Sequence, residues 1–222
     1  MSIINNLKQY DRIFVDTASL LVDYKSLHYP PIYKRNNSSD SNERFLKKYP
    51  NKQVQDDFFL KNLAPALLSL NKKIIITNDV IKELEGHTNI TERKINFLSM
   101  KEDTTKEEAK KSLNRLASRA ENAKKIISIY QKKELCEFFG GQNYPFTDNV
   151  FITVFFRFLT KYNMCLLTQD KALARDIEKI KNFEAIKYTK KINSFFICAG
   201  GDSFSLFKNI NHKPFAVIKK SP

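Results

Sequence analysis

Four acidic residues, each beside an apolar run, are the part of the sequence best suited to chemistry: Asp16, Glu83, Asp148 and Asp170. If folding gathers them into one pocket, their carboxylates repel one another strongly unless cations neutralise them. Hard oxygen ligands of this kind select Mg²⁺ or Mn²⁺. One or two such ions could lower the pKa of a bound water and act as Lewis acids on a substrate.

Taken singly, each acid also has a structural explanation. Asp16 could sit in a turn, Asp148 could favour the dipole of a helix that it opens, and Asp170 could cap a helix. A further acid, Asp176, lies deeper in its predicted helix and is expected to face solvent. Only the joint placement of the four acids favours a site, so the elements that carry them decide the question.

Two of the acids follow predicted strands. Asp16 comes directly after an apolar run at residues 13–15, and Asp170 follows a second run at residues 164–167 after a two-residue gap. In an open parallel sheet, ligands bind beyond the carboxyl ends of the strands. Both acids are therefore expected at that edge of the sheet.

The other two acids belong to helices that start from the same edge. Glu83 lies in the first turns of the helix predicted after a β-branched strand at residues 74–76. Asp148 opens a strongly apolar helix predicted at residues 148–162. All four acids can therefore project over one sheet edge.

Strands alternate with helices along most of the chain, with a further strand predicted at residues 135–139 and helices at residues 106–133 and 172–180. This order predicts an α/β fold with a mainly parallel central sheet covered by helices on both faces. We predict a single domain over residues 1–222, with a C-terminal β extension at residues 192–222. Apolar runs at 195–199 and 204–207 around a Gly-Gly-Asp turn predict a hairpin appendage there, with one more strand at 215–218.

Residues 25–55 break the pattern and are predicted to form a flexible basic insertion. Seven basic residues stand there against two acids, with three Tyr and one Phe interleaved. Such an arm suits single-stranded nucleic acid. The candidate contacts are Lys34, Arg35, Arg44, Lys47 and Lys48. An ordinary solvated loop is the alternative.

The formal net charge of +14 attracts polyanions, although a solubilising lysine-rich surface would have the same composition. The most apolar run, at residues 151–159, is far shorter than the ~20 residues that a membrane span needs. Nucleic acid is therefore the expected partner, without a membrane. The amino-terminal residues lack the pattern of a secretory signal, so a cytoplasmic location is expected. Cys136, Cys165 and Cys198 are interpreted as reduced core residues and not as metal ligands.

The segments IFVDTASLL, IIITNDVIKELEGH, FTDNVFITVFF and LLTQDKALARD resemble, in order, the four acidic blocks of the PIN-domain nucleases. The resemblance implies a PIN fold, with Asp16, Glu83, Asp148 and Asp170 as the catalytic and metal-binding residues. It implies a hydrolase that uses Mg²⁺ or Mn²⁺ to cut phosphodiester bonds, in RNA more than in DNA. Thr168 would hold a ligand in place or contact the substrate. His87, four residues after Glu83, could approach the pocket, and a surface or helix-end role is its alternative.

The sequence departs from a minimal PIN domain in the insertion after the first block and in the C-terminal hairpin. The main alternative hypothesis is a PIN-fold module that binds nucleic acid or protein without catalysis. A phosphatase that uses Asp16 is less favoured, because dehalogenase-type phosphatases require a second acid two residues after the first, and Ala18 occupies that position here. Some PIN proteins are toxins held by an antitoxin, so a regulatory protein partner belongs among the expectations, although nothing in this sequence identifies one.

Overall fold

The computed structural model describes Asn5 and residues 7–21, 64–65, 69, 74–132, 136–139, 147–180, 190–200 and 203–208. For Tyr130, Lys132, Thr147 and residues 136–139, 198–200 and 203–208, only the backbone is described. The insertion predicted at residues 25–55 and the strand predicted at residues 215–218 lie outside this part of the chain.

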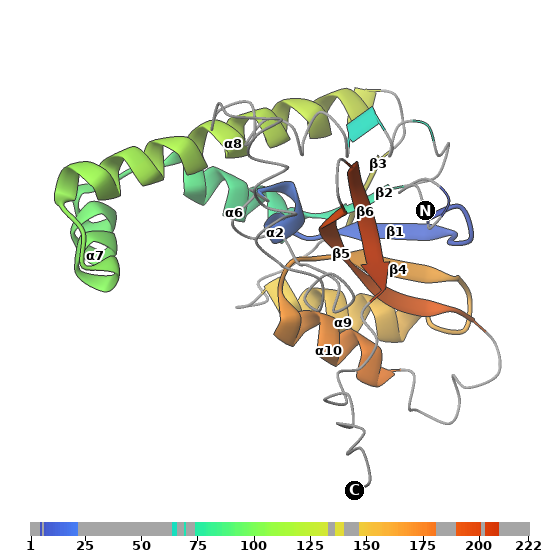
Figure 1. The fold of residues 1–222 in the computed structure, drawn as a ribbon. Coiled ribbons are helices and arrows are strands. Elements are labelled where there is room, and N and C mark those ends of the chain that lie inside the picture. The colour runs from blue at the N-terminus through green and yellow to red at the C-terminus, as the bar shows by residue number, and fades with distance from the viewer. Residues whose placement is uncertain are drawn as a thin grey trace, which may run out of the picture.

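The described strands form one sheet in the order β3-β2-β1-β4-β5-β6 (Figure 1). Their bounds are β1 (Arg12–Val15), β2 (Ile74–Thr77), β3 (Cys136–Phe139), β4 (Met164–Leu167), β5 (Ile192–Gly200) and β6 (Ser203–Lys208). Neighbouring strands from β3 to β5 are parallel, and β5 and β6 are antiparallel. Every residue of β2 and β4 is buried, as expected for parallel strands covered on both faces. The predicted α/β class is confirmed.

The C-terminal strands extend the central sheet, which corrects the prediction of an appendage. The nine residues of β5 are enough to pair with two strands. Its first half is parallel to β4, from Ile192 opposite Met164 to Phe195 opposite Leu167. The rest of β5 pairs with β6, from Phe195 to Gly200. The predicted β extension starts at residue 192, as β5 does, but the sequence pattern gave no sign that this strand pairs with β4.

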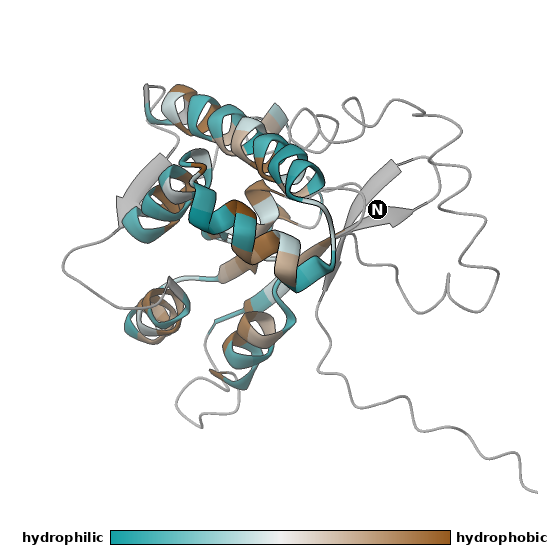
Figure 2. Ribbon diagram, turned by 90° about the vertical axis from the view of Figure 1, so that its left-hand side faces the viewer, coloured by the Kyte–Doolittle hydropathy of each residue, from teal (hydrophilic) through white to brown (hydrophobic). Residues whose placement is uncertain are grey.

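The described helices are α2 (Thr17–Leu20), α6 (Asn78–Thr88), α7 (Glu92–Glu102), α8 (Lys106–Lys132), α9 (Thr147–Phe158) and α10 (Lys171–Lys179). The two views place α6 and α8 on one side of the sheet and α9 and α10 on the other (Figures 1 and 2). Phe14 of β1 faces α9, and its ring centroid lies 6.5 Å from that of Phe151 and 4.9 Å from that of Phe155. None of the described helices is both long and apolar enough to cross a membrane.

Helices α7 and α8 form an arm that projects from the body of the protein (Figure 1). The C-terminal half of α8 packs into the core through Ala120, Ala123 and Ile127. Its N-terminal half contacts α7, which the sequence analysis did not predict. Thr91 begins α7 by accepting a hydrogen bond from the Lys94 backbone N–H at 3.3 Å. Figure 2 shows hydrophilic and hydrophobic positions interleaved along these helices, so only one face of each is suited to burial.

Strand β1 lies where the strand order changes direction. The chain adds β2 and β3 on one side of β1 and β4 and β5 on the other. The carboxyl ends of these central strands are joined by backbone hydrogen bonds, from Asp16 N–H to the Leu167 carbonyl at 2.9 Å and from Thr168 N–H to the Phe195 carbonyl at 3.0 Å. In open α/β sheets, ligands bind outside the carboxyl ends at such a switch point. The residues that follow β1 and β4 are therefore the first place to look for a site.

Candidate functional site

Asp16 ends β1 and occupies the N-cap position of α2, yet its carboxylate makes no capping hydrogen bond there. The side chain is instead turned into the protein, where the residue is only 6% exposed. The Thr168 hydroxyl donates a hydrogen bond of 2.6 Å to Asp16 Oδ2. Asp16 therefore lies in a turn, as its structural explanation required, and its carboxylate is also buried and oriented by Thr168.

Burial is the main reason why the pKa of Asp16 rises to about 7, since a buried carboxylate loses its hydration. The hydrogen bond from Thr168 opposes this rise because it stabilises the charged form. The charges of Glu83 and Asp148 raise the pKa further. Three acids from three separate segments therefore lie close enough to repel one another.

Thr168 links the two acids that follow the central strands. Its Oγ1 donates to Asp16 and accepts a hydrogen bond from the Asp170 backbone N–H at 2.9 Å. Thr168 is completely buried, so of the two roles expected for it, the geometry supports holding Asp16 in place over contacting a substrate. The next residue fixes the loop to β5, because the Gln169 amide exchanges two hydrogen bonds with the Ile197 backbone, of 3.1 and 2.8 Å.

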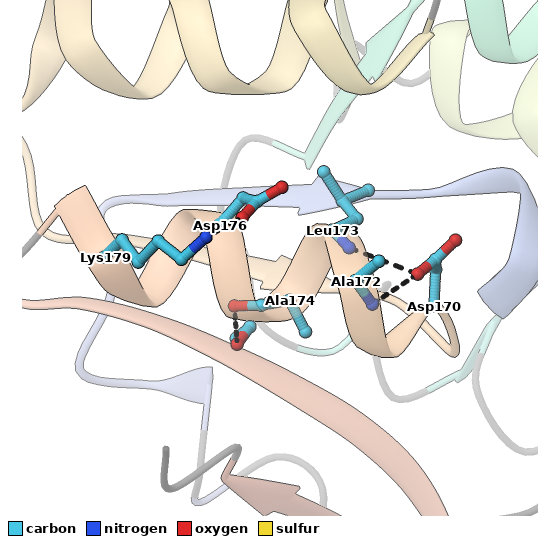
Figure 3. Close-up of polar contacts among 7 residues, drawn as sticks. Asp170, Ala172, Leu173, Ala174, Asp176 and Lys179 are labelled. Carbon is cyan, nitrogen blue, oxygen red and sulfur yellow. Dashed lines mark hydrogen bonds and ion pairs between the residues drawn. The ribbon is translucent and has the colours of Figure 1, made fainter. Parts of the chain in front are cut away.

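Asp170 is the N-cap of α10, as its structural explanation required (Figure 3). Its Oδ1 accepts hydrogen bonds from the backbone N–H groups of Ala172, at 2.6 Å, and Leu173, at 3.1 Å. Its other carboxylate oxygen points away from these two amides (Figure 3). One oxygen of Asp170 therefore fixes the helix start while the carboxylate keeps a second oxygen for a ligand.

Glu83 reaches the site from α6. The N-cap residue of α6 is Thr77, whose side chain accepts a hydrogen bond from Val80 N–H. The hydroxyl of Thr17 donates to Glu83 Oε2 at 2.8 Å. This positioning role of Thr17 was missed in the sequence, although a hydroxyl directly after the first acid was a usable signal. His87 Nε2 lies 3.9 Å from Glu83 Oε1, so His87 is placed beside Glu83 in the last turn of α6.

Asp148 lies in the first turn of α9. Its pKa is raised by burial and by the charges of Asp170, Glu83 and Asp176. Asp176 pairs with Lys179 at 2.7 Å (Figure 3), and its side chain is 45% exposed. It nevertheless acts on Asp148, so the expectation that Asp176 merely faces solvent was incomplete. Its position three residues after buried Leu173, at the border of the buried face of α10, was the sequence signal for this.

The predicted acids thus lie near one another, but they do not form a complete coordination shell. Asp16 interacts electrostatically with Glu83 and Asp148, and Asp148 interacts with Asp170. Within the described ranges, no three His, Cys, Asp or Glu side chains are grouped closely enough to hold one ion as they stand. Cys165 is a buried free cysteine, whereas the side chains of Cys136 and Cys198 lie outside the description. The candidate nucleic-acid contacts Lys34, Arg35, Arg44, Lys47 and Lys48 also lie outside it.

The chemistry of the donor set fits a hard divalent cation. The groups that hold Asp16 and Glu83 are threonine hydroxyls, and those that hold Asp170 are backbone amides. These donors are neutral, so they orient the carboxylates without adding a positive charge of their own. Four negatively charged side chains with oxygen ligands, near the carboxyl ends of the parallel strands, suit Mg²⁺ or Mn²⁺.

Comparison with known proteins adds no further assignment, because no family model, curated protein or solved structure matches this chain.

Proposed function

We propose that the protein is a PIN-type nuclease that hydrolyses phosphodiester bonds, in single-stranded RNA, with the help of Mg²⁺ or Mn²⁺. The observation that carries this proposal is the placement of Asp16. It is a buried carboxylate at the switch point of the sheet, held by a hydroxyl and within electrostatic reach of acids from α6 and α9. The acid of α9, Asp148, in turn interacts with Asp170 before α10. A fold maintains such crowded charge when a cation can offset it.

The roles of the acids follow from how firmly each is held. Asp16 and Asp170 are the central ligands, because Thr168 ties both of them to the loop after β4. Glu83 and Asp148 approach from α6 and α9 and complete the ligand set. The hydroxyls of Thr17 and Thr168 restrict the rotation of their carboxylates, so less ordering is needed when the ion binds.

When bound, Mg²⁺ or Mn²⁺ supplies Lewis-acid chemistry, polarising the scissile phosphate and making water nucleophilic near neutral pH. The acids position that charge at the carboxyl ends of β1 and β4. His87, next to Glu83, can hold Glu83 in place or exchange a proton with it. Water provides the attacking oxygen, and the bond between phosphorus and the leaving oxygen breaks.

The whole protein carries a formal charge of +14, so an acidic pocket is set in a basic molecule. Basic residues outside the pocket attract the phosphate backbone, whereas the carboxylates exclude it until a cation is present. RNA is preferred over DNA in this proposal on the strength of the resemblance of the four acidic segments. A regulatory protein that blocks the pocket, as an antitoxin does, is compatible with the same arrangement.

Single-stranded RNA incubated with Mg²⁺ or Mn²⁺ tests the proposal directly, using wild type, Asp16→Asn and Asp170→Asn. Both variants keep the size of the side chain and remove ligand charge. We expect the wild type to cut and each variant to lose at least about 100-fold in rate, with RNA affinity retained. Lys110→Gln, on the exposed surface of α8, is the matched control for a change of one charge and should cut like the wild type.

Cleavage that survives both chelator and Asp16→Asn would exclude this chemistry. RNA binding without cleavage under either metal would instead support the non-catalytic PIN-fold module. A calorimetric titration with Mn²⁺ separates the two steps, since the metal site can exist even where no RNA is cut. In that titration both Asp→Asn variants should bind Mn²⁺ more weakly than the wild type.

A further inference from the structure

At the amino end of the sheet, opposite the acids, three separate segments are joined by one residue, Asn163. Its backbone carbonyl accepts hydrogen bonds from Asp11 N–H at 2.8 Å and Arg12 N–H at 3.2 Å. Its backbone N–H donates to Asp11 Oδ2 at 2.8 Å, and its side-chain Oδ1 accepts from Lys191 N–H at 2.9 Å. The segments that lead into β1, β4 and β5 are therefore fixed side by side.

Each of these segments carries two basic residues. Together they form what we call the Asn163 surface: Lys8, Arg12, Arg157, Lys161, Lys190 and Lys191. All are exposed except Arg12, which is partly buried. Within the described residues 7–12, 157–163 and 190–191 the one acid is Asp11, so six positive charges and one negative charge leave a local net charge of +5. The Asp11 carboxylate already accepts a hydrogen bond from Asn163.

Aromatic rings hold several of these cations in place. The Arg12 guanidinium lies 4.3 Å from the centroid of the Tyr162 ring, and Lys161 Nζ lies 5.3 Å from the same centroid. Arg157 lies 5.8 Å from the centroid of Phe158. Among the described residues, Arg157 and Lys161 are placed against rings and not against carboxylates. A ring orients a cation without cancelling its charge, so these residues keep their attraction for an anion.

We propose that the Asn163 surface binds phosphate groups of single-stranded nucleic acid at a second contact, remote from the acidic pocket. A single strand offers a row of phosphates to the spaced cations, whereas each lipid headgroup offers only its own phosphate. This proposal deepens the nuclease proposal and rests on it for the identity of the polyanion. It adds a place where the uncut part of the substrate is held.

The two contacts are separated by the length of the central strands. Four residues at about 3.3 Å each set the amino and carboxyl ends of β1 and β4 about 13 Å apart. At about 3.4 Å per stacked nucleotide, a strand needs at least about four nucleotides to cover that distance. An RNA shorter than this cannot reach both contacts at once, whereas a twelve-nucleotide RNA can.

The test measures binding of a twelve-nucleotide single-stranded RNA in chelator, across a salt series, for the variant Arg157→Gln/Lys161→Gln/Lys191→Gln. The matched control is Lys106→Gln/Lys110→Gln/Arg115→Gln, which removes one Arg and two Lys from the exposed surface of α8. Losing three phosphate contacts should reduce the slope of log K against log salt by about 2 and the affinity at 0.1 M salt by up to about 100-fold. The control should leave both nearly unchanged.

An equal loss in both triple variants, or no RNA binding by the wild type, overturns the proposal, because binding would then not depend on this surface. Loss of binding to phosphatidylserine vesicles with unchanged RNA binding overturns it in favour of a lipid surface. Thermal unfolding of both variants checks that neither result comes from a damaged fold. Chelator keeps catalysis out of the binding measurement. If the same RNA is bound through this surface but is not cut when it is incubated separately with Mg²⁺ or Mn²⁺, the nuclease proposal fails and this one stands. If the triple variant at the Asn163 surface binds RNA normally and still cuts it, this proposal fails and the nuclease proposal stands.

Discussion

Two threonine hydroxyls hold the acids at the centre of the candidate site. Thr168 bonds to Asp16 across 152 residues of sequence, and Thr17 bonds to Glu83 across 66. Each hydroxyl restrains a carboxylate with a neutral donor, which adds no positive charge. At this scale the site is a set of oriented acids, and their orientation depends on neighbours that cannot bind a metal strongly themselves.

Thr168→Val should separate orientation from folding. Valine fills the same space but removes the donor to Asp16 and the acceptor for Asp170 N–H, which should cost about 1–3 kcal/mol of stability. Because the Thr168 hydrogen bond lowers the pKa of Asp16, its loss should also move the pH profile of cleavage upward. Kinetics from pH 5 to 9 measure this shift. Thr168→Ser, which retains the hydroxyl, should restore the wild-type profile, and a profile that stays unmoved in Thr168→Val would contradict the role assigned to this hydroxyl.

Asp16→Asn should stabilise the metal-free protein above neutral pH. The pKa of Asp16 rises from 3.8 to about 7 on folding, so the folded state holds its proton more tightly than the unfolded state. Stability is therefore lost as pH rises from about 4 to about 7, and that loss amounts to on the order of 4 kcal/mol. Urea unfolding in chelator should show the variant more stable at pH 8, with the difference vanishing near pH 4.

The control for this experiment is added Mg²⁺ or Mn²⁺, which should stabilise the wild type by mass action and the variant much less. A variant that is less stable than the wild type at pH 8 in chelator would show that the charge of Asp16 is compensated in the metal-free protein. The crowding of acids would then have another explanation.

At the scale of elements, the central strands could be predicted because their apolar runs are short, continuous and bounded by acids or loops. The runs at residues 74–76 and 164–167 correspond closely to β2 and β4. Helix α7 was missed because it buries only Ile95 and Ser99 and exposes Phe97 and Met100, so its apolar pattern does not mark one face. The apolar run predicted at residues 195–199 is shorter than β5, because polar Asn193 and Ser194 lie near the start of the strand, where they are buried.

The polar start of β5 has a packing reason that sequence periodicity does not reveal. Ser194 N–H donates to Glu178 Oε1 of α10 at 2.8 Å, and the Asn193 side-chain amide donates to the Tyr10 hydroxyl. Buried polar groups are tolerated when they are hydrogen-bonded, and these bonds link β5 to α10 and to the segment before β1. Partners 16 and 183 residues away cannot be read from a local pattern.

Two substitutions at Asp170 distinguish its support of α10 from its support of the site. Asp170→Asn keeps an oxygen for the amides of Ala172 and Leu173, so stability should change little while metal-dependent cleavage falls. Asp170→Ala removes the cap as well and should cost about 1 kcal/mol in addition. Thermal unfolding and cleavage measured on the same samples decide this. Equal stability losses in the two variants would mean that charge, and not capping, is what Asp170 contributes to the helix.

At the scale of the whole molecule, the acids of the candidate site and the cations of the Asn163 surface lie at opposite ends of the central strands. The acids gather at the carboxyl ends of the strands, and the Asn163 surface gathers cations at the amino ends. The positions of the acids could be predicted from their place after strands. The cations of the Asn163 surface could not, because Lys and Arg occur throughout this sequence and only the fold shows which of them meet.

Deleting residues 31–51 should weaken binding to single-stranded RNA and flatten its salt dependence. This segment includes the predicted contacts Lys34, Arg35, Arg44, Lys47 and Lys48, and each lost phosphate contact lowers the slope against log salt by about 0.7. Far-ultraviolet circular dichroism should remain unchanged. Replacing the same segment with a Gly-Ser linker of equal length controls for the loss of chain, and affinity that stays the same across the salt series would leave the segment as an ordinary loop.

The bond between Thr168 and Asp16 also sets when activity can begin. Strand β1 is made first, yet β4, its neighbour at the site, ends 152 residues later at Leu167. At about 5–20 residues per second, a ribosome takes about 8–30 s to make that interval. Until then no partial chain contains Thr168 or Asp170, and Asp16 lacks the residues that hold it. A nascent chain of the proposed nuclease therefore lacks the complete set of acids until Asp170 has been made, while it is still beside the messenger and ribosomal RNA that produce it.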